Sequence, residues 1–170
     1  MNAIESEELH GLAEQVGAAL KVRGWMLASA ESCTGGWVGE AVTAVPGSSH
    51  WYDRGFITYT NEAKQEMLGV APATLAQYGA VSEQTVREMV SGALKHSRAK
   101  VALAISGIAG PGGGSPQKPV GTVCLAWGVK DGSVQAQTRH FSGDRQQVRA
   151  QAVAAALQGV LECVGVDSAP

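Results

Sequence analysis

The feature that most constrains the fold is a pair of short, almost wholly apolar stretches, residues 25–30 (WMLASA) and 101–105 (VALAI). Each is short for a helix and lacks a polar face, so each is expected to form a strand buried on both faces. Apolar residues recur at helical spacing around them, over 7–23, 37–45, 82–94 and 144–160. Helices interleaved with buried strands predict a layered α/β domain.

The remaining strands are predicted by turn chemistry and β-branched residues. Residues 122–129 and 134–141 flank Asp131-Gly132, which is a strong hairpin signal. Residues 56–60 (FITYT) favour a strand, and Asn61 can cap the helix that follows it. We therefore expect one three-layer α/β/α domain over residues 1–170, with a mixed, mainly parallel sheet and a C-terminal hairpin. The two apolar strands should be central, and the alternating strand 134–141 should lie near an edge.

Composition excludes several classes of protein. Apolar residues make up 45% of the chain and charged residues 16%, which argues against disorder. A net charge of −2 gives no surplus for binding nucleic acid, and no apolar run approaches the ~20 residues that span a membrane. Three scattered cysteines and four isolated histidines predict reduced thiols, a cytoplasmic location and no metal site.

Three polar clusters each follow an expected strand: residues 31–36, 59–64 and 106–115. In open α/β sheets, ligands bind at the carboxyl ends of the strands. If these strands are parallel neighbours, the three clusters should converge on one crevice.

The first cluster, Ser32-Cys33-Thr34-Gly35-Gly36, stands between a buried strand and the start of a helix. Main-chain N–H groups at such a point are unpaired and can bind an anion or an oxyanion, with Ser32 as a nucleophile. The other interpretation is that Ser32 or Thr34 only caps the helix and the glycines only make a tight turn. Cys33 is a rival nucleophile, or a small buried side chain.

A serine nucleophile needs a base, and Lys64 is the candidate. It is expected in the first turn of a helix, where the positive end of the helix dipole lowers a lysine pKa. The alternative is a solvated lysine that pairs with Glu62 or Glu66.

Two further features could bind substrate. The loop that begins at Ser106 and Gly107 is rich in glycine but lacks the P-loop ending, so it can bind a phosphate or be a plain crossover. Arg145 can clamp a phosphate or pair with Asp144.

Several long motifs in this sequence resemble those of the CinA C-terminal domain family, in the same order over nearly the whole chain. They are residues 30–36 (AESCTGG), 55–64 (GFITYTNEAK), 79–82 (GAVS), 106–113 (SGIAGPGG), 118–123 (KPVGTV) and 143–145 (GDR). The likeness is strongest to the stand-alone, single-domain members.

The resemblance implies hydrolysis of the carboxamide of nicotinamide mononucleotide to nicotinate mononucleotide and ammonia. It also implies a homodimer that needs no metal or other cofactor. By this resemblance Ser32 is the nucleophile, Lys64 the general base, and Tyr59 a helper through its hydroxyl. Substrate binding falls to Ser106, Gly107 and Arg145.

The residues themselves add the N–H groups of Thr34, Gly35 and Gly36 as candidate oxyanion donors, since amide hydrolysis develops a negative oxygen. Two other functions stay open: a non-catalytic nucleotide-binding or regulatory module, and an amidase for another small carboxamide.

Overall fold

The computed structural model describes residues 3–165, with side chains from residue 5 onward. Residues 1–2 and 166–170 of the expected 1–170 domain lie outside this part. Five strands form one sheet in the order β2-β1-β3-β4-β5. Their bounds are β1 Leu27–Glu31, β2 Tyr52–Ile57, β3 Val101–Gly107, β4 Thr122–Val129 and β5 Val134–His140. β1 pairs in parallel with β2 and β3, while β4 is antiparallel to both β3 and β5. The mixed sheet, the C-terminal hairpin, the central apolar strands and the edge strand are thus confirmed.

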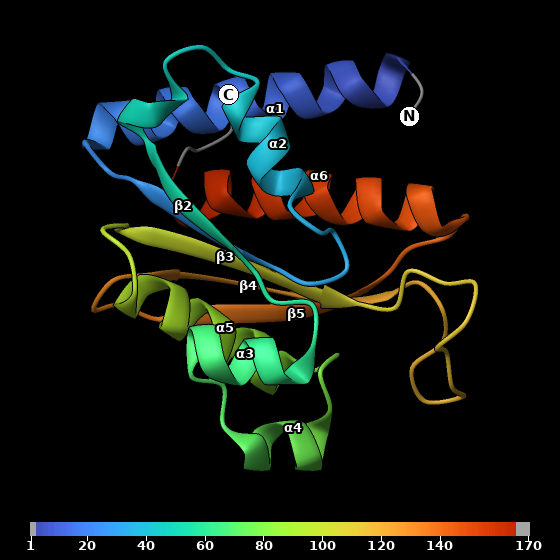
Figure 1. Ribbon diagram of the computed structural model, residues 1–170. Helices are drawn as coiled ribbons and strands as arrows, with labels where there is room; N and C mark the ends of the chain where they lie inside the picture. Colours follow the sequence, from blue (N-terminus) through green and yellow to red (C-terminus); the bar gives the residue numbers. More distant parts are fainter. Residues whose placement is uncertain (1–2, 166–170) are drawn as a thin grey trace.

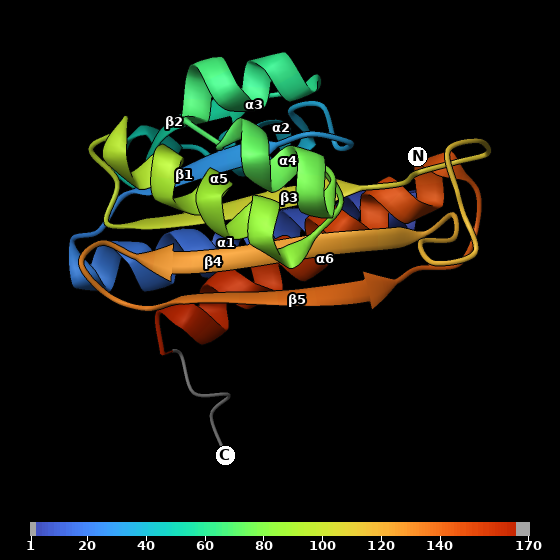
Figure 2. The same ribbon diagram turned by 90° about the horizontal axis from the view of Figure 1, so that it is seen from below.

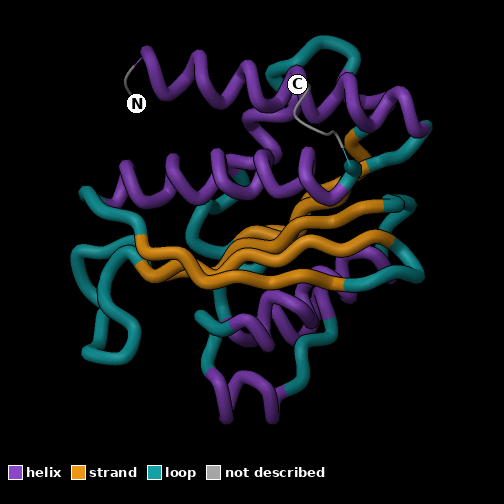
Figure 3. Tube along the Cα trace, turned by 180° about the vertical axis from the view of Figure 1, so that it is seen from behind, coloured by secondary structure: helices purple, strands orange, loops and turns teal. Residues whose placement is uncertain are grey.

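Helices cover both faces of the sheet (Figure 1). One face carries α1 (Ala3–Arg23), α2 (Trp37–Thr43) and α6 (Arg145–Cys163). The other face carries α3 (Asn61–Leu68), α4 (Pro72–Tyr78) and α5 (Glu83–Lys95). A short 3-10 helix, Ser48–His50, precedes β2. Seen from behind, the helix–sheet–helix layers are plain (Figure 3), which confirms the α/β/α architecture.

Strand alternation divides the interior into two cores. On β3, Leu103 and Ile105 pack toward α1 and α6, whereas Ala102 and Ala104 face α5. Small side chains on the α5 side let that helix lie close to the sheet. α5 also lies close to α3, because Gly92 leaves no room for a β-carbon against the main chain of Leu68. α3 is therefore held at a fixed position under the sheet.

Two local expectations were wrong. β2 spans 52–57 rather than 56–60, because the chain leaves the sheet once the Thr58 N–H has bonded to the Glu31 carbonyl. Thr60, not Asn61, caps α3, since its hydroxyl accepts the N–H of Ala63 at 3.1 Å. The Ser82 cap and the Asp144–Gln147 capping box are confirmed.

The parallel strands β2, β1 and β3 end at the same edge of the sheet. Figure 2 shows this sheet from the side that α3, α4 and α5 cover. The three polar clusters follow these three strand ends, so the expected convergence is confirmed for their main chains. Across residues 3–165, none of the helices has the length and apolar character to cross a bilayer.

Candidate active site

Ser32 and Lys64 meet under the carboxyl end of β1. The Lys64 Nζ lies 3.0 Å from the Ser32 Oγ, although the residues are 32 positions apart in the chain. Ser32 continues the β1 ladder, because its N–H donates to the Ile105 carbonyl of β3. Its side chain faces α3, the helix that carries Lys64. The alcohol and the amine are therefore within direct proton-transfer reach.

The surroundings of Lys64 are main-chain carbonyls. Its side chain is only 1% exposed, and the Nζ also contacts the carbonyl oxygens of Thr58 at 2.8 Å and Tyr59 at 3.2 Å. A neutral amine has two N–H donors and one lone pair. The two carbonyls can take both hydrogens, which leaves the lone pair for the Ser32 hydroxyl.

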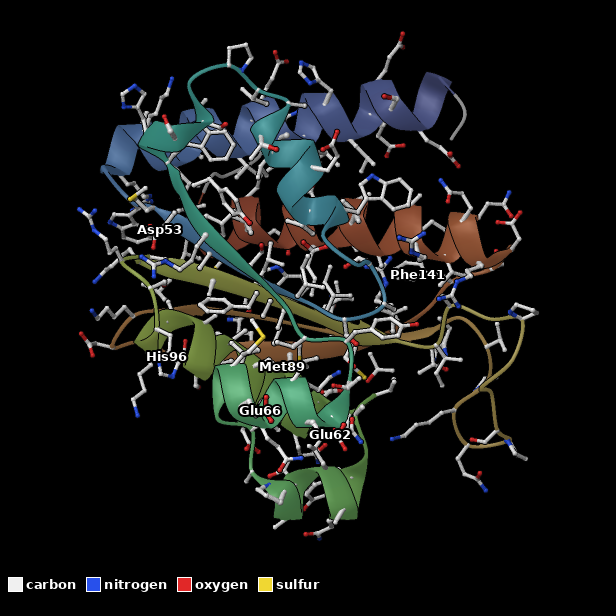
Figure 4. The ribbon with its side chains drawn as sticks, viewed as in Figure 1. Asp53, Glu62, Glu66, Met89, His96 and Phe141 are labelled. Carbon is white, nitrogen blue, oxygen red and sulfur yellow. The ribbon has the colours of Figure 1, made fainter. Side chains whose placement is uncertain are left out.

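Lys64 does not pair with its helix neighbours. Glu62 and Glu66 are exposed on α3 (Figure 4), and within residues 5–165 Lys64 forms no salt bridge. Burial without a counter-ion lowers the pKa of the Lys64 ammonium below its ordinary value. The solvated-lysine alternative is therefore wrong, and the amine has the character that a general base requires.

Cys33 is not a competing nucleophile in this geometry. It points to the opposite face of the sheet from Ser32 and packs in the core under α1 and α6. Burial raises the pKa of the Cys33 thiol to about 11. At neutral pH it is a protonated, buried thiol, which is inert.

The turn that carries Ser32 is held by Glu31, whose carboxylate is 1% exposed. Its Oε1 accepts the Thr34 hydroxyl at 2.7 Å and the Val38 N–H at 2.9 Å. Its Oε2 accepts the Gly39 N–H at 3.2 Å. The buried charge is stabilised by these donors at the start of α2.

The expected oxyanion donors are only partly free. The Gly35 N–H donates to the Ser32 carbonyl at 3.1 Å, so it is already used inside the turn. The Thr34 side chain is fully buried and bonded to Glu31, which removes its hydroxyl from substrate contact. The N–H groups of Thr34 and Gly36 have no acceptor among residues 3–165, and these two remain as candidates.

Tyr59 and Arg145 contact each other beside Lys64. The Tyr59 side chain is 61% exposed, and its hydroxyl accepts a hydrogen bond from Arg145 Nη2 at 3.3 Å. Arg145 Nη1 donates to the Gly110 carbonyl at 2.8 Å. The Asp144 side chain caps α6 and forms no salt bridge with Arg145. Tyr59 thus contacts Lys64 through its carbonyl and Arg145 through its hydroxyl.

Ser106 and Gly107 end β3 beside the Ser32 turn. Ser106 is 1% exposed and lies on the same face of the sheet as Ser32. A β-carbon on Gly107 would lie 2.7 Å from a methyl group of Val123, so packing against β4 requires glycine there. Within residues 5–165, no group of three or more His, Cys, Asp or Glu side chains could hold a metal ion.

Comparison with known proteins identifies the family. The CinA C-terminal domain matches residues 9–164. The chain belongs to the CinA C-terminal domain family. "Nicotinamide-nucleotide amidohydrolase PncC" of Escherichia coli K12 is 58% identical over 89% of this chain and 92% of its own length. The protein of the same name from Enterobacter agglomerans is 54% identical over 93% and 96%, respectively.

Solved structures of this family have the same fold. The competence/damage-inducible protein CihA of Agrobacterium tumefaciens is 46% identical and superposes with a TM-score of 0.88, covering 91% of this chain and 94% of its own. ComA of Klebsiella pneumoniae is 42% identical, with a TM-score of 0.89 and coverage of 94% and 99%.

Sequence alone assigned no role to two residues that contact the Ser32 turn, Glu31 and Arg149. Glu31 adjoins the Ser32 cluster, but an acidic residue at the end of a buried strand does not reveal that it will accept N–H groups seven and eight residues later. Arg149 stands 115 residues or more from the turn it contacts, on an amphipathic helix. No local sequence signal distinguishes it from a solvated arginine.

Proposed function

We propose that this chain hydrolyses the carboxamide of nicotinamide mononucleotide to nicotinate mononucleotide and ammonia. The observation that carries the proposal is the 3.0 Å contact between a buried, carboxylate-free Lys64 amine and the Ser32 hydroxyl. The names of the two relatives described above supply the substrate. Ser32 acts as the nucleophile, and Lys64 as the general base.

In the first half of the reaction, the Lys64 amine takes the Ser32 proton while Oγ forms a bond to the carboxamide carbon. The C=O electron pair moves onto the oxygen, giving a tetrahedral oxyanion that main-chain N–H donors stabilise. The oxyanion then collapses and the C–N bond breaks. The Lys64 ammonium gives its proton to the leaving nitrogen, which departs as ammonia and leaves an ester on Ser32.

The second half reverses the roles. Lys64, again neutral, takes a proton from a water molecule whose oxygen attacks the ester carbon. The bond from this carbon to Ser32 Oγ breaks, and Lys64 returns the proton to Oγ. The product is a carboxylic acid, which ionises to nicotinate mononucleotide. No step needs a metal or a redox partner.

Arg145 and Tyr59 are proposed to bind the substrate. Arg145 is exposed and keeps N–H groups beyond the two used by Gly110 and Tyr59, and these can contact a phosphate. The hydroxyl of Tyr59, through which the resemblance implies that it helps, is proposed to position Arg145. Ser106, beside Ser32 on the same face, is proposed to contact the ring or its carboxamide.

The test is ammonia release from nicotinamide mononucleotide by purified protein. Ser32→Ala and Lys64→Met should each lower kcat by at least 100-fold, the usual size of losing a nucleophile or base. Ser29→Ala is the matched control, since Ser29 is also buried on β1 but bonds to the Tyr52 hydroxyl. Full activity in Ser32→Ala would refute the mechanism.

The same assay separates the alternatives. Equal turnover of nicotinamide would indicate an amidase for other small carboxamides, and tight binding of nicotinamide mononucleotide without ammonia would indicate a binding module. We further propose that the chain acts as a homodimer in the cytoplasm. Its three thiols are unpaired within residues 5–165, as is usual in a reducing compartment. Light scattering on purified protein tests the dimer.

A further inference from the structure

We propose that Arg149 is a positioning residue that aims the Thr34 N–H at the substrate oxyanion, an inference that rests on the proposed amidase function. Arg149 extends from α6 to the Ser32 turn. Its Nε donates to the Cys33 carbonyl at 2.9 Å and its Nη2 to the Thr34 carbonyl at 3.3 Å. Its guanidinium also lies over the Trp37 ring, 5.4 Å from the centroid.

These contacts are unusual for an arginine. Within residues 5–165, Arg149 forms no salt bridge. Its guanidinium donates instead to two main-chain carbonyls. The bonds to both carbonyls are partly buried, and such charge-assisted bonds are stronger and more directional than neutral ones. The guanidinium therefore fixes the orientation of two successive peptide groups.

The direction of the Thr34 N–H follows from peptide geometry. The Cys33 carbonyl and the Thr34 N–H belong to one planar trans peptide, so they point in opposite directions. The carbonyl points toward α6, on one face of the sheet. The N–H must then point toward the other face, where Lys64 meets Ser32.

The second peptide is fixed in the same way. The Thr34 carbonyl accepts both Arg149 and the Trp37 N–H, and the Gly35 N–H of that peptide donates to the Ser32 carbonyl. Two carbonyls of the turn, those of Cys33 and Thr34, are thus bonded to Arg149 of α6. The Thr34 N–H remains buried and without an acceptor among residues 3–165. A buried donor without a partner can bond to a substrate oxygen that reaches it.

The test compares Arg149→Met and Arg149→Lys with Arg23→Met. Arg23 is a matched control, because its guanidinium also stacks on a tryptophan, 5.1 Å from the Trp25 centroid. Arg23 precedes the start of β1, whereas Ser32 follows its end. Loss of one oxyanion donor lowers kcat by roughly 100-fold. We expect such a fall in Arg149→Met, a smaller fall in Arg149→Lys, and KM within twofold in both.

A substrate with a weaker acceptor distinguishes the proposed positioning role of Arg149 from a purely structural one. A thiocarboxamide places sulfur, a weak hydrogen-bond acceptor, where the oxyanion forms. Wild-type protein should strongly prefer the carboxamide of the nucleotide over its thiocarboxamide, and Arg149→Met should lose at least tenfold of that preference. An unchanged preference, or kcat within twofold of wild type, would overturn the inference.

The proposed function can fail separately. If wild-type protein releases no ammonia, the amidase proposal is refuted, and the orientation of the peptide is then tested alone. A crystal structure of Arg149→Met, or of Arg149→Lys if the first variant does not fold, should show the 33–34 peptide rotated. A peptide plane unchanged from wild type overturns the positioning role whatever the activity.

Discussion

Replacing Glu31 by glutamine should loosen the turn that carries Ser32, the proposed nucleophile, while changing almost no volume. The glutamine oxygen can keep the two shorter bonds, from the Thr34 hydroxyl at 2.7 Å and the Val38 N–H at 2.9 Å. Its NH₂ group then occupies the place of Oε2 and faces the Gly39 N–H, donor against donor. The partly buried Gly39 N–H is left unpaired.

The magnitude follows from the bonds lost. A hydrogen bond to a charged group contributes roughly 1.5–3 kcal/mol. Removing the negative charge at the start of α2 adds roughly 0.3–1 kcal/mol, and the easier burial of a neutral amide offsets part of the sum. We expect a net loss of about 2 kcal/mol in the free energy of unfolding, or about 5 °C in Tm for a chain of this length.

Activity should fall with stability. Ser32 is next to Glu31 in the chain, and small displacements of a nucleophile are costly, so kcat should fall by roughly tenfold. Thermal unfolding and ammonia release measure the two effects. Glu40→Gln is the control, because Glu40 is exposed in the first turn of the same helix. If Glu31→Gln unfolds within 1 °C of wild type with the same kcat, the carboxylate does not hold the turn.

Four further outcomes are expected. Cys33→Ala should keep kcat within about threefold of wild type, and Cys33 should resist thiol reagents at pH 8 while the chain is folded, because its pKa is about 11. Activity should fall as pH falls through the folded Lys64 pKa, because the base becomes protonated. Burial lowers the Lys64 pKa, so the unfolded chain binds the Lys64 proton more tightly than the folded chain does. The free energy of unfolding should therefore rise as pH rises from the folded Lys64 pKa toward the ordinary lysine pKa of about 10.4. Urea unfolding at pH 7 and pH 9 checks this, and Lys64→Met should flatten the rise. Arg145→Ala should raise KM for the nucleotide by roughly tenfold at similar kcat, and steady-state kinetics showing no change in KM would remove it from the phosphate site. Gly92→Ala should cost roughly 1–3 kcal/mol in urea unfolding, because a β-carbon would push the Leu68 main chain and displace the helix that carries Lys64.

The sequence by itself determined the layered fold and pointed to the two groups proposed to react, Ser32 and Lys64. Two uncharged apolar stretches are stable only as strands covered on both faces, and the hairpin signal at Asp131-Gly132 and the caps at Ser82 and Asp144 are local chemistry. The motifs around Ser32 and Lys64 carried the family resemblance and with it their expected roles. All of these depend on residues that are close together in the chain.

Tertiary structure decided what depends on distant contacts. The pKa of Lys64 is lowered because the Ser32 turn and the 58–60 segment exclude water from it, which position in a helix alone does not reveal. Glu31 and Arg149 make their contacts with the Ser32 turn and α2 only when α2 and α6 pack against the same face of the sheet. The hydroxyl of Tyr59 accepts a hydrogen bond from Arg145, which is 86 residues away in the chain. Sequence specifies which groups are present, but only packing sets their solvation and the direction of their hydrogen bonds, because both depend on what surrounds them in space.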